Sequence, residues 1–160
     1  MDLDQQIQAL IEKAPPDGST AQILEAIAPA LLLMAQQLQH LEYSILQAID
    51  QSWAIVILSN LKQPGREKRV IYAWSSLQDA LQAAAAGDRL KSVSLPVTHI
   101  LFQMIALEGL ESIVFFESPG NLEVGTEITR EQVQNLINVY LQQYRSTLQS
   151  NSSNLPPDIA

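Results

Sequence analysis

The sequence predicts a mixed α/β fold of the α+β type, in which helices pack on a single mixed sheet. Two observations carry this prediction. Several segments place apolar residues at the three-and-four spacing of an amphipathic helix, and several short β-branched runs are bounded by turn residues. The chain has 160 residues, about one domain, and 47% of them are apolar, which suits a packed core. The predicted order is helix, helix, strand, strand, helix, strand, helix, strand, strand, helix.

The first part of the chain is predicted to be helical. Residues 3–13 carry a helical apolar stripe that ends at Pro15-Pro16-Asp17-Gly18. Ser19-Thr20-Ala21-Gln22 is typical of a capping box, and a long helical segment is predicted from there to about Asp50. Pro29 predicts a kink or a restart within it.

This long segment has an apolar seam with alternating spacings of three and four residues. Its members are Leu24, Ile27, Leu31, Met34, Leu38, Leu41, Ile45 and Ala48. Such a seam packs either inside its own chain or against another chain, and the sequence leaves both open. If it forms an interface, the residues expected to contact the partner are Leu31, Met34, Leu38, Leu41 and Ile45.

An antiparallel hairpin is predicted next. The run 53–58 is apolar and short, which favours a buried strand, and residues 70–74 form the returning strand. Between them, residues 62–69 contain Pro64-Gly65, a pair typical of a turn.

The second half alternates helices and short strands. Its elements are a helix from Ser75-Ser76 to about Ala86, a strand at 91–95, a helix opened by Pro96, strands at 110–116 and 122–128, and a final helix capped by Thr129-Arg130-Glu131-Gln132.

Four stretches of residues 53–141 resemble the N-terminal domain of the SseB (enhanced serine sensitivity B) family. They are Ala73-Trp74-Ser75-Ser76-Leu77-Gln78-Asp79-Ala80-Leu81, Val93-Ser94-Leu95-Pro96 with Ile100-Leu101, Gly109-Leu110-Glu111-Ser112-Ile113-Val114-Phe115-Phe116, and Ile128-Thr129-Arg130-Glu131-Gln132-Val133. The resemblance implies a fold. It implies no catalytic role, because the family has no established one. The predicted organisation is therefore a helical segment at 1–50, an SseB-like domain at 51–147 and a disordered tail at 148–160.

No catalytic, cofactor or metal site is predicted. The chain has no cysteine and only two histidines, His40 and His99, neither at the spacing of a zinc site. Six carboxylates of the second half lack the spacing of a calcium loop and are expected to form a solvated acidic face: Glu108, Glu111, Glu117, Glu123, Glu127 and Glu131.

The basic residues Lys62, Arg66, Lys68 and Arg69 cluster in and beside the hairpin turn. They are interpreted either as a docking point for an acidic partner or an anion, or as charges that keep a hairpin tip soluble. The net charge of −8 disfavours a nucleic-acid partner.

The function predicted from these features is non-enzymatic protein binding, as an adaptor or an assembly or regulatory factor. Self-association through the N-terminal helices is expected from the apolar seam. A cytoplasmic location is expected because no signal peptide and no membrane span is recognised. The alternative is a small-molecule sensor or a cryptic hydrolase with a pocket between sheet and helices. An enclosed cavity with convergent polar groups would favour that alternative.

Overall fold

The computed structural model describes residues 2–59, 65, 67–84, 89–121 and 125–153, and of residues 148–153 it describes only the backbone. The described chain forms a six-stranded mixed sheet with five helices, which confirms the predicted fold class. The helices are α1 (Leu3–Glu12), α2 (Thr20–Gln36), α3 (Leu77–Ala83), α4 (Val97–Ala106) and α5 (Arg130–Ser153). The strands are β1 (Glu42–Gln47), β2 (Val56–Ser59), β3 (Glu67–Trp74), β4 (Lys91–Pro96), β5 (Ser112–Phe116) and β6 (Gly125–Thr129).

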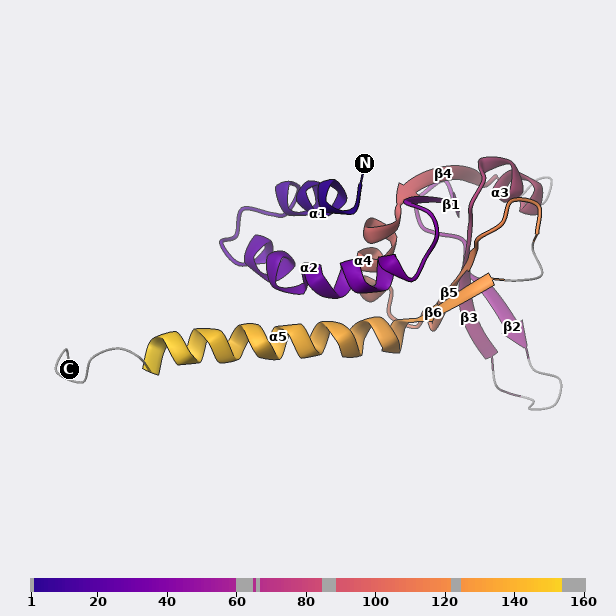
Figure 1. Ribbon diagram of the computed structural model, residues 1–160. Coiled ribbons are helices and arrows are strands. Elements are labelled where there is room, and N and C mark those ends of the chain that lie inside the picture. Colours follow the sequence, from indigo (N-terminus) through magenta and orange to yellow (C-terminus); the bar gives the residue numbers. More distant parts are fainter. Residues whose placement is uncertain (1, 60–64, 66, 85–88, 122–124, 154–160) are drawn as a thin grey trace.

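The strand order is β4-β1-β3-β5-β6, and β2 pairs with β3. Only the β3–β5 pair is parallel among these strands. Two strands pair with different parts of the same edge of β3. Ser44 of β1 pairs with Trp74 at one end of β3, and β2 pairs with residues 67–70 at the other end. On the other edge β5 begins its pairing only at Val70, so residues 67–69 of β3 pair with β2 alone. We call β2 together with these three residues the arm; it projects past the rest of the sheet (Figure 1).

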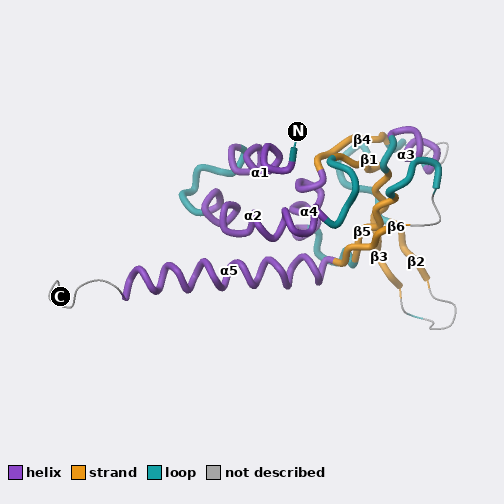
Figure 2. The backbone as a smooth tube through the Cα atoms, in the orientation of Figure 1, coloured by secondary structure: helices purple, strands orange, loops and turns teal. Residues whose placement is uncertain are grey.

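Four helices cover one face of the sheet, which we call the helix face. In Figure 2, α1, α2, α4 and α5 all lie on the same side of the strands. Alternate residues of the central strands point into this layer, among them Ile71, Ile113 and Phe115, which are fully buried. The main hydrophobic core therefore lies between these four helices and the sheet.

The opposite face, which we call the open face, has a much smaller cover. Among the described helices, only α3 packs on it, against β1, β3 and β4. Beneath α3 a second cluster joins Leu46, Trp74, Ala80 and Phe116. A helix of 7 residues is too short to shield six strands, so α3 covers only part of this face.

The hairpin of β2 and β3 is antiparallel, as predicted. Residues Thr129 and Gln132 form the predicted reciprocal cap of α5. The capping box predicted at the start of α2 does not form. The Ser19 side chain makes no capping bond, and Asp17 accepts hydrogen bonds from the backbone N–H groups of Ser19 and Thr20 instead.

The predicted long helix to Asp50 is wrong. Helix α2 runs through Pro29 and ends at Gln36, and residues 42–47 form β1, so the chain has one more strand than predicted. Tyr43 and Ile45 alternate toward the core, and pairing of this segment with β4 and β3 satisfies its backbone groups as a strand. At the other end, α5 continues to Ser153, past the boundary at 147 where a disordered tail was predicted to begin. Residues 154–160 lie outside the described residues.

Candidate functional site

The predicted apolar seam belongs to the core of the chain. Leu31, Met34, Leu38 and Ile45 are buried, so the structure takes the alternative in which this seam packs within one chain. Leu41 alone of the five expected contact residues is exposed. The seam therefore offers no continuous docking surface.

The basic residues of the predicted turn are only partly described. Lys62 and Arg66 lie outside the described residues. Lys68 forms an ion pair with Glu127, which also accepts a hydrogen bond from Ser112 Oγ. The hydrogen bond from Lys68, helped by that from Ser112, lowers the pKa of Glu127 from its ordinary value. Arg69 lies directly opposite Ile57 in the arm and is exposed.

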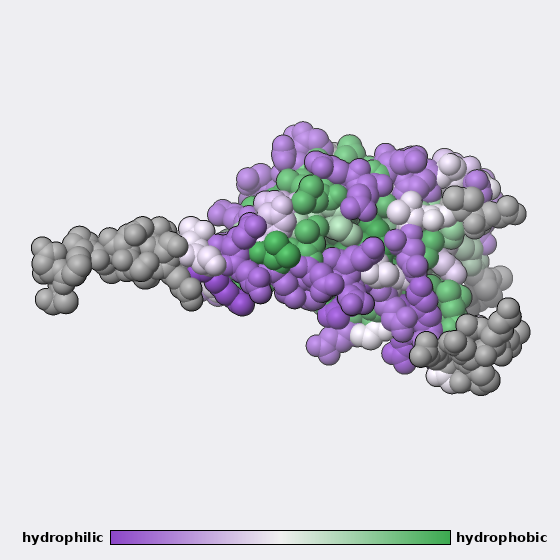
Figure 3. Space-filling model, turned by 60° about the horizontal axis from the view of Figure 1, so that its bottom comes forward, coloured by the Kyte–Doolittle hydropathy of each residue, from purple (hydrophilic) through white to green (hydrophobic). Residues whose placement is uncertain are grey.

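The apolar run 53–58 was predicted to be a buried strand, and this prediction is wrong for most of it. Ile55, Ile57 and Leu58 are 47%, 53% and 40% exposed. The reason is the position of β2: it pairs with β3 where the sheet has already narrowed to two strands, beyond the cover of the helices. Figure 3 shows hydrophobic side chains reaching the surface at the sheet end of the molecule.

An apolar pocket of about 320 Å³ adjoins β2 on the open face. It opens where β1 separates from β3, next to the point at which the Ala54 N–H donates to the Leu46 carbonyl oxygen. Its lining consists of Leu46, Ala54, Ile55, Val56, Tyr72, Trp74, Ala83 and Leu90. Only Tyr72 and Trp74 in this lining carry a polar side-chain atom. We call the pocket together with Ile57 and Leu58 the β2 surface.

The inner wall of this pocket is a set of packed aromatic rings. The centroids of Tyr72 and Trp74 are 6.0 Å apart, and those of Trp74 and Phe116 are 6.3 Å apart. Rings in mutual contact are held in place before any ligand arrives. Sequence reasoning missed this site, although Tyr72 and Trp74 stand two residues apart in a predicted strand and so share one face.

The outer edge of β2 is free in the described structure, because β2 pairs with β3 alone. Its four residues, Val56–Ser59, include no charged residue and no proline. Natural edge strands are usually protected by such residues, by a bulge or by a covering segment. Among the described residues, the β2 surface thus combines exposed apolar side chains, a preformed pocket and a strand edge to which no strand is paired.

A polar cluster lies elsewhere, where the turn before β1 meets the end of β5. Tyr43 Oη donates to Glu117 Oε1 over 2.8 Å, and the Gln39 N–H donates to Glu117 Oε2 over 2.7 Å. Burial, then the hydrogen bond and the negative charge of Glu117, raise the pKa of the Tyr43 hydroxyl above its ordinary value. His40 Nε2 contacts the Glu117 carbonyl oxygen. These bonds join the turn before β1 to the end of β5.

The second histidine also has a structural contact. His99 Nε2 donates to the Gln6 carbonyl oxygen over 3.0 Å. The buried Gln6 side chain accepts from the Thr98 N–H and hydroxyl and donates to the Leu41 carbonyl oxygen. Gln6 therefore joins α1 to the start of α4 and to the start of β1.

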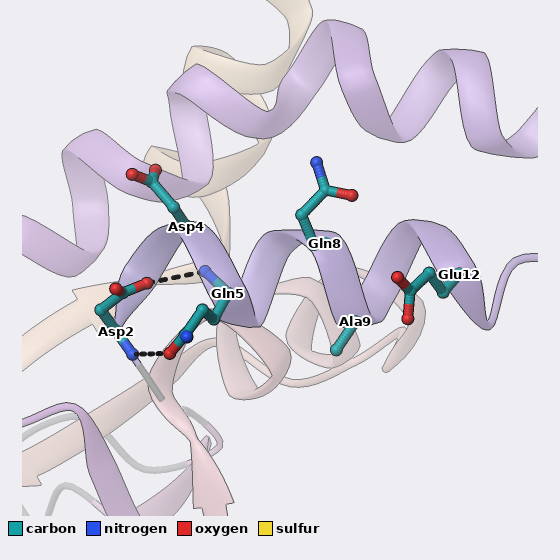
Figure 4. A pocket seen from close by; sticks show the side chains of 6 residues that line it. All are labelled: Asp2, Asp4, Gln5, Gln8, Ala9 and Glu12. Carbon is teal, nitrogen blue, oxygen red and sulfur yellow. Dashed lines mark hydrogen bonds between the residues drawn. The ribbon is translucent and has the colours of Figure 1, made fainter.

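A shallow hollow on the outward side of α1 is lined by carboxylates, but they do not converge. Figure 4 shows Asp2 and Gln5 in a reciprocal cap, with Asp4 pointing elsewhere and Glu12 at the far end of the helix. The Asp2 carboxylate is already engaged by the Gln5 N–H. This hollow is therefore helix surface, and the β2 surface is the better candidate site.

No family model matches the chain, and no curated protein matches it either. The resemblance to the SseB family remains a prediction from four short motifs. Within the described ranges, no three His, Asp or Glu side chains are grouped so that they could hold a metal ion. No helix of the described residues has the length and apolar character required to cross a membrane.

Proposed function

We propose that this protein is a binding module that acts without catalysis, as an adaptor or an assembly or regulatory factor, and that its partner is a protein docked on the β2 surface. The observation that carries the proposal is the exposure of Ile57 and Leu58 on β2, and of Ile55 just before it, beside a preformed apolar pocket. Exposed apolar side chains next to a pocket are typical of an interaction site.

Other exposed apolar residues support this choice by contrast. Ile23, Leu33 and Val139 are exposed on α2 and α5. The backbone groups of a helix interior are already bonded within the helix, so these residues offer side chains alone. On β2, exposed side chains and the free backbone groups of a strand edge lie together. A partner that binds the arm can therefore gain more binding free energy per contacted residue than one that binds a helix.

Burial of the exposed apolar side chains at residues 55–58 is by itself too weak to hold a stable complex. Covering the exposed halves of Ile55, Ile57 and Leu58 is worth roughly 2–4 kcal/mol in total. Association of two proteins costs about 4–15 kcal/mol in lost freedom. A stable complex therefore requires a filled pocket or new main-chain hydrogen bonds in addition.

The alternative of a small-molecule sensor or hydrolase keeps one supporting observation, the pocket itself. Its volume of about 320 Å³ is at the small end for ligand sites. The lining is apolar except for one phenol and one indole, whereas a hydrolase needs convergent polar groups around the reacting bond. We therefore favour an apolar side chain of a protein as the occupant.

The proposal is tested by cross-linking in the native cell, followed by mass spectrometry. The variant Ile57→Ser with Leu58→Ser removes the apolar side chains of the arm. The matched control, Ile23→Ser with Val139→Ser, removes two helix residues of similar exposure. We expect a set of proteins that is captured by the wild type and the control and is lost from the arm variant. Equal capture by all three, with folding verified by circular dichroism, would contradict the proposal.

A further inference from the structure

We propose that the partner binds as an extended, acidic peptide segment that adds a strand to the free edge of β2, inserts one apolar side chain into the pocket and places carboxylates beside the basic residues of the arm. This inference rests on the proposed function and specifies the chemistry of its ligand. Three independent features of the described residues support it: the strand edge, the pocket and the charges.

The strand edge selects an extended segment. The residues of β2 present N–H and C=O groups on the side away from β3, and in the described structure no strand pairs with that side. Only another extended chain satisfies such a row of groups in register. Residues 67–69 of β3 have β2 as their only paired strand, with one further backbone bond from the Glu111 N–H to the Arg69 carbonyl oxygen, and a ribbon of two strands is marginally stable in water. A third strand would give the arm the minimum that an independent sheet needs.

The pocket selects an apolar side chain in that segment. Ala54, Ile55 and Val56 line it, so the pocket begins where the free edge begins. Side chains of an added strand alternate between the two faces of the sheet, and every second one falls on the open face. A cavity of about 320 Å³ holds one branched aliphatic or aromatic side chain at this point.

The charges favour acidic residues in that segment. Of the three β3 residues of the arm, Lys68 and Arg69 are basic and Glu67 is acidic, whereas the chain as a whole carries −8. Lys68 is engaged by Glu127, and Arg69 forms no ion pair with any described residue. The exposed, unpaired Arg69 therefore attracts a carboxylate of a strand added beside β2.

The test uses the full chain and a display library of random twelve-residue peptides, selected at low salt. The enriched peptides are synthesised, and their affinity is measured by calorimetry and their binding site by amide chemical shifts. We expect enriched sequences with alternating apolar residues and an excess of Asp and Glu. Their shift changes should centre on residues 54–59.

Four variants separate the three features. In a strand, neighbouring residues direct their amides to opposite edges, so one of Ile57→Pro and Leu58→Pro removes the free-edge donor and the other the donor to β3. The free-edge variant should keep the wild-type spectrum and bind at least tenfold more weakly. Ala83→Leu, at an exposed position that lines the pocket, should also weaken binding about tenfold. Arg69→Glu should weaken it severalfold at low salt and much less at high salt.

Several outcomes overturn the inference. They are the absence of any enriched peptide, enrichment without acidic or apolar bias, and binding that none of these variants weakens. Sedimentation that shows a dimer, dissociated by the free-edge proline variant, would assign the edge to a second copy instead. If cross-linking still identifies a partner through Ile57 and Leu58 while peptides fail to bind, the proposed function stands and only the extended-strand mode is wrong.

Discussion

The two faces of the sheet are formed by the same strands but are covered by helices to different extents. On the helix face, Ile71, Ile113 and Phe115 lie fully buried beneath four helices. On the open face, Tyr72 and Val114 come from the same two strands and remain partly exposed beside one short helix. The alternation of a strand thus divides its residues between a fully covered face and a partly exposed one.

A second contrast lies within β3 itself. Residues 70–74 have β5 on one edge and β1 or β2 near the other, whereas residues 67–69 pair with β2 alone. In the first part every side chain except the half-buried Tyr72 is buried, whereas in the second part Glu67 and Arg69 are exposed and Lys68 is half-buried. The predictions that follow test both contrasts.

The largest effect is expected at the helix face. Ile71→Ala removes a fully buried side chain and should lower the free energy of unfolding by about 2–5 kcal/mol. Ile57→Ala, at a position 53% exposed, should change it by only about 0.5 kcal/mol. Urea denaturation with an unchanged m-value measures both. Equal losses would show that the arm is as well packed as the core.

A smaller effect is expected where the open face is tight. A Cβ atom on Gly125 would lie 2.7 Å from Val114 Cγ1 and 3.2 Å from the Phe115 carbonyl oxygen. Gly125→Ala should therefore cost about 1–3 kcal/mol of stability. Adding Val114→Ala removes the nearest atom, so the double variant should lose less than the sum of the single losses. Simple additivity would mean that the backbone contact, and not Val114, sets the cost.

Tyr43→Phe tests the hydrogen bond from Tyr43 to Glu117. The stability that this bond contributes is expected to depend on pH in the alkaline range. At neutral pH the substitution should cost about 1 kcal/mol, the worth of one hydrogen bond. Because the folded pKa of Tyr43 is raised above its ordinary value of 10.0, its contribution is complete below pH 10 and is lost as the pH rises further. The stability difference between wild type and variant should therefore shrink above pH 10. Parallel stability curves up to pH 11 would contradict this.

The smallest effect is expected at the ion pair of the arm. Glu127→Gln should cost about 0–1 kcal/mol at pH 7, since both side chains of the pair are substantially exposed. The pKa of Glu127 is lowered, so its contribution is present above the ordinary carboxyl pKa of 4.5 and is lost as the pH falls through the depressed value. The loss should also fade in 1 M salt, which thermal unfolding at two salt concentrations will show. A salt-independent loss would point to the Ser112 hydrogen bond instead.

Local signals predicted much of the fold. Ser76, Pro96 and Thr129 start helices where the sequence placed them, because caps and proline act on their immediate neighbours. The strand at 42–47 was missed because Leu38, Leu41 and Ile45 fit a helical seam, and only pairing with distant β4 makes this segment a strand. No proline or glycine marks the end of α2 after Gln36.

The candidate site was harder to predict than the fold. The run 53–58 is apolar enough for a core strand, and its exposure follows from the point at which β5 stops pairing with β3. The pocket needs Leu46, Tyr72 and Leu90 together, and they come from β1, β3 and the segment before β4. Such a site depends on tertiary placement, which no local pattern encodes.

The position of α2 has a consequence for the order of events during synthesis. Its apolar side packs against α4 and α5, yet α2 leaves the ribosome roughly 100 residues before α5 does, about 5–20 s at ordinary elongation rates. During that interval the side of α2 that packs against α5 has no cover from it. The helices that are synthesised first therefore complete their packing last. A nascent chain of this protein should need a chaperone to cover its first 50 residues until its final helix emerges.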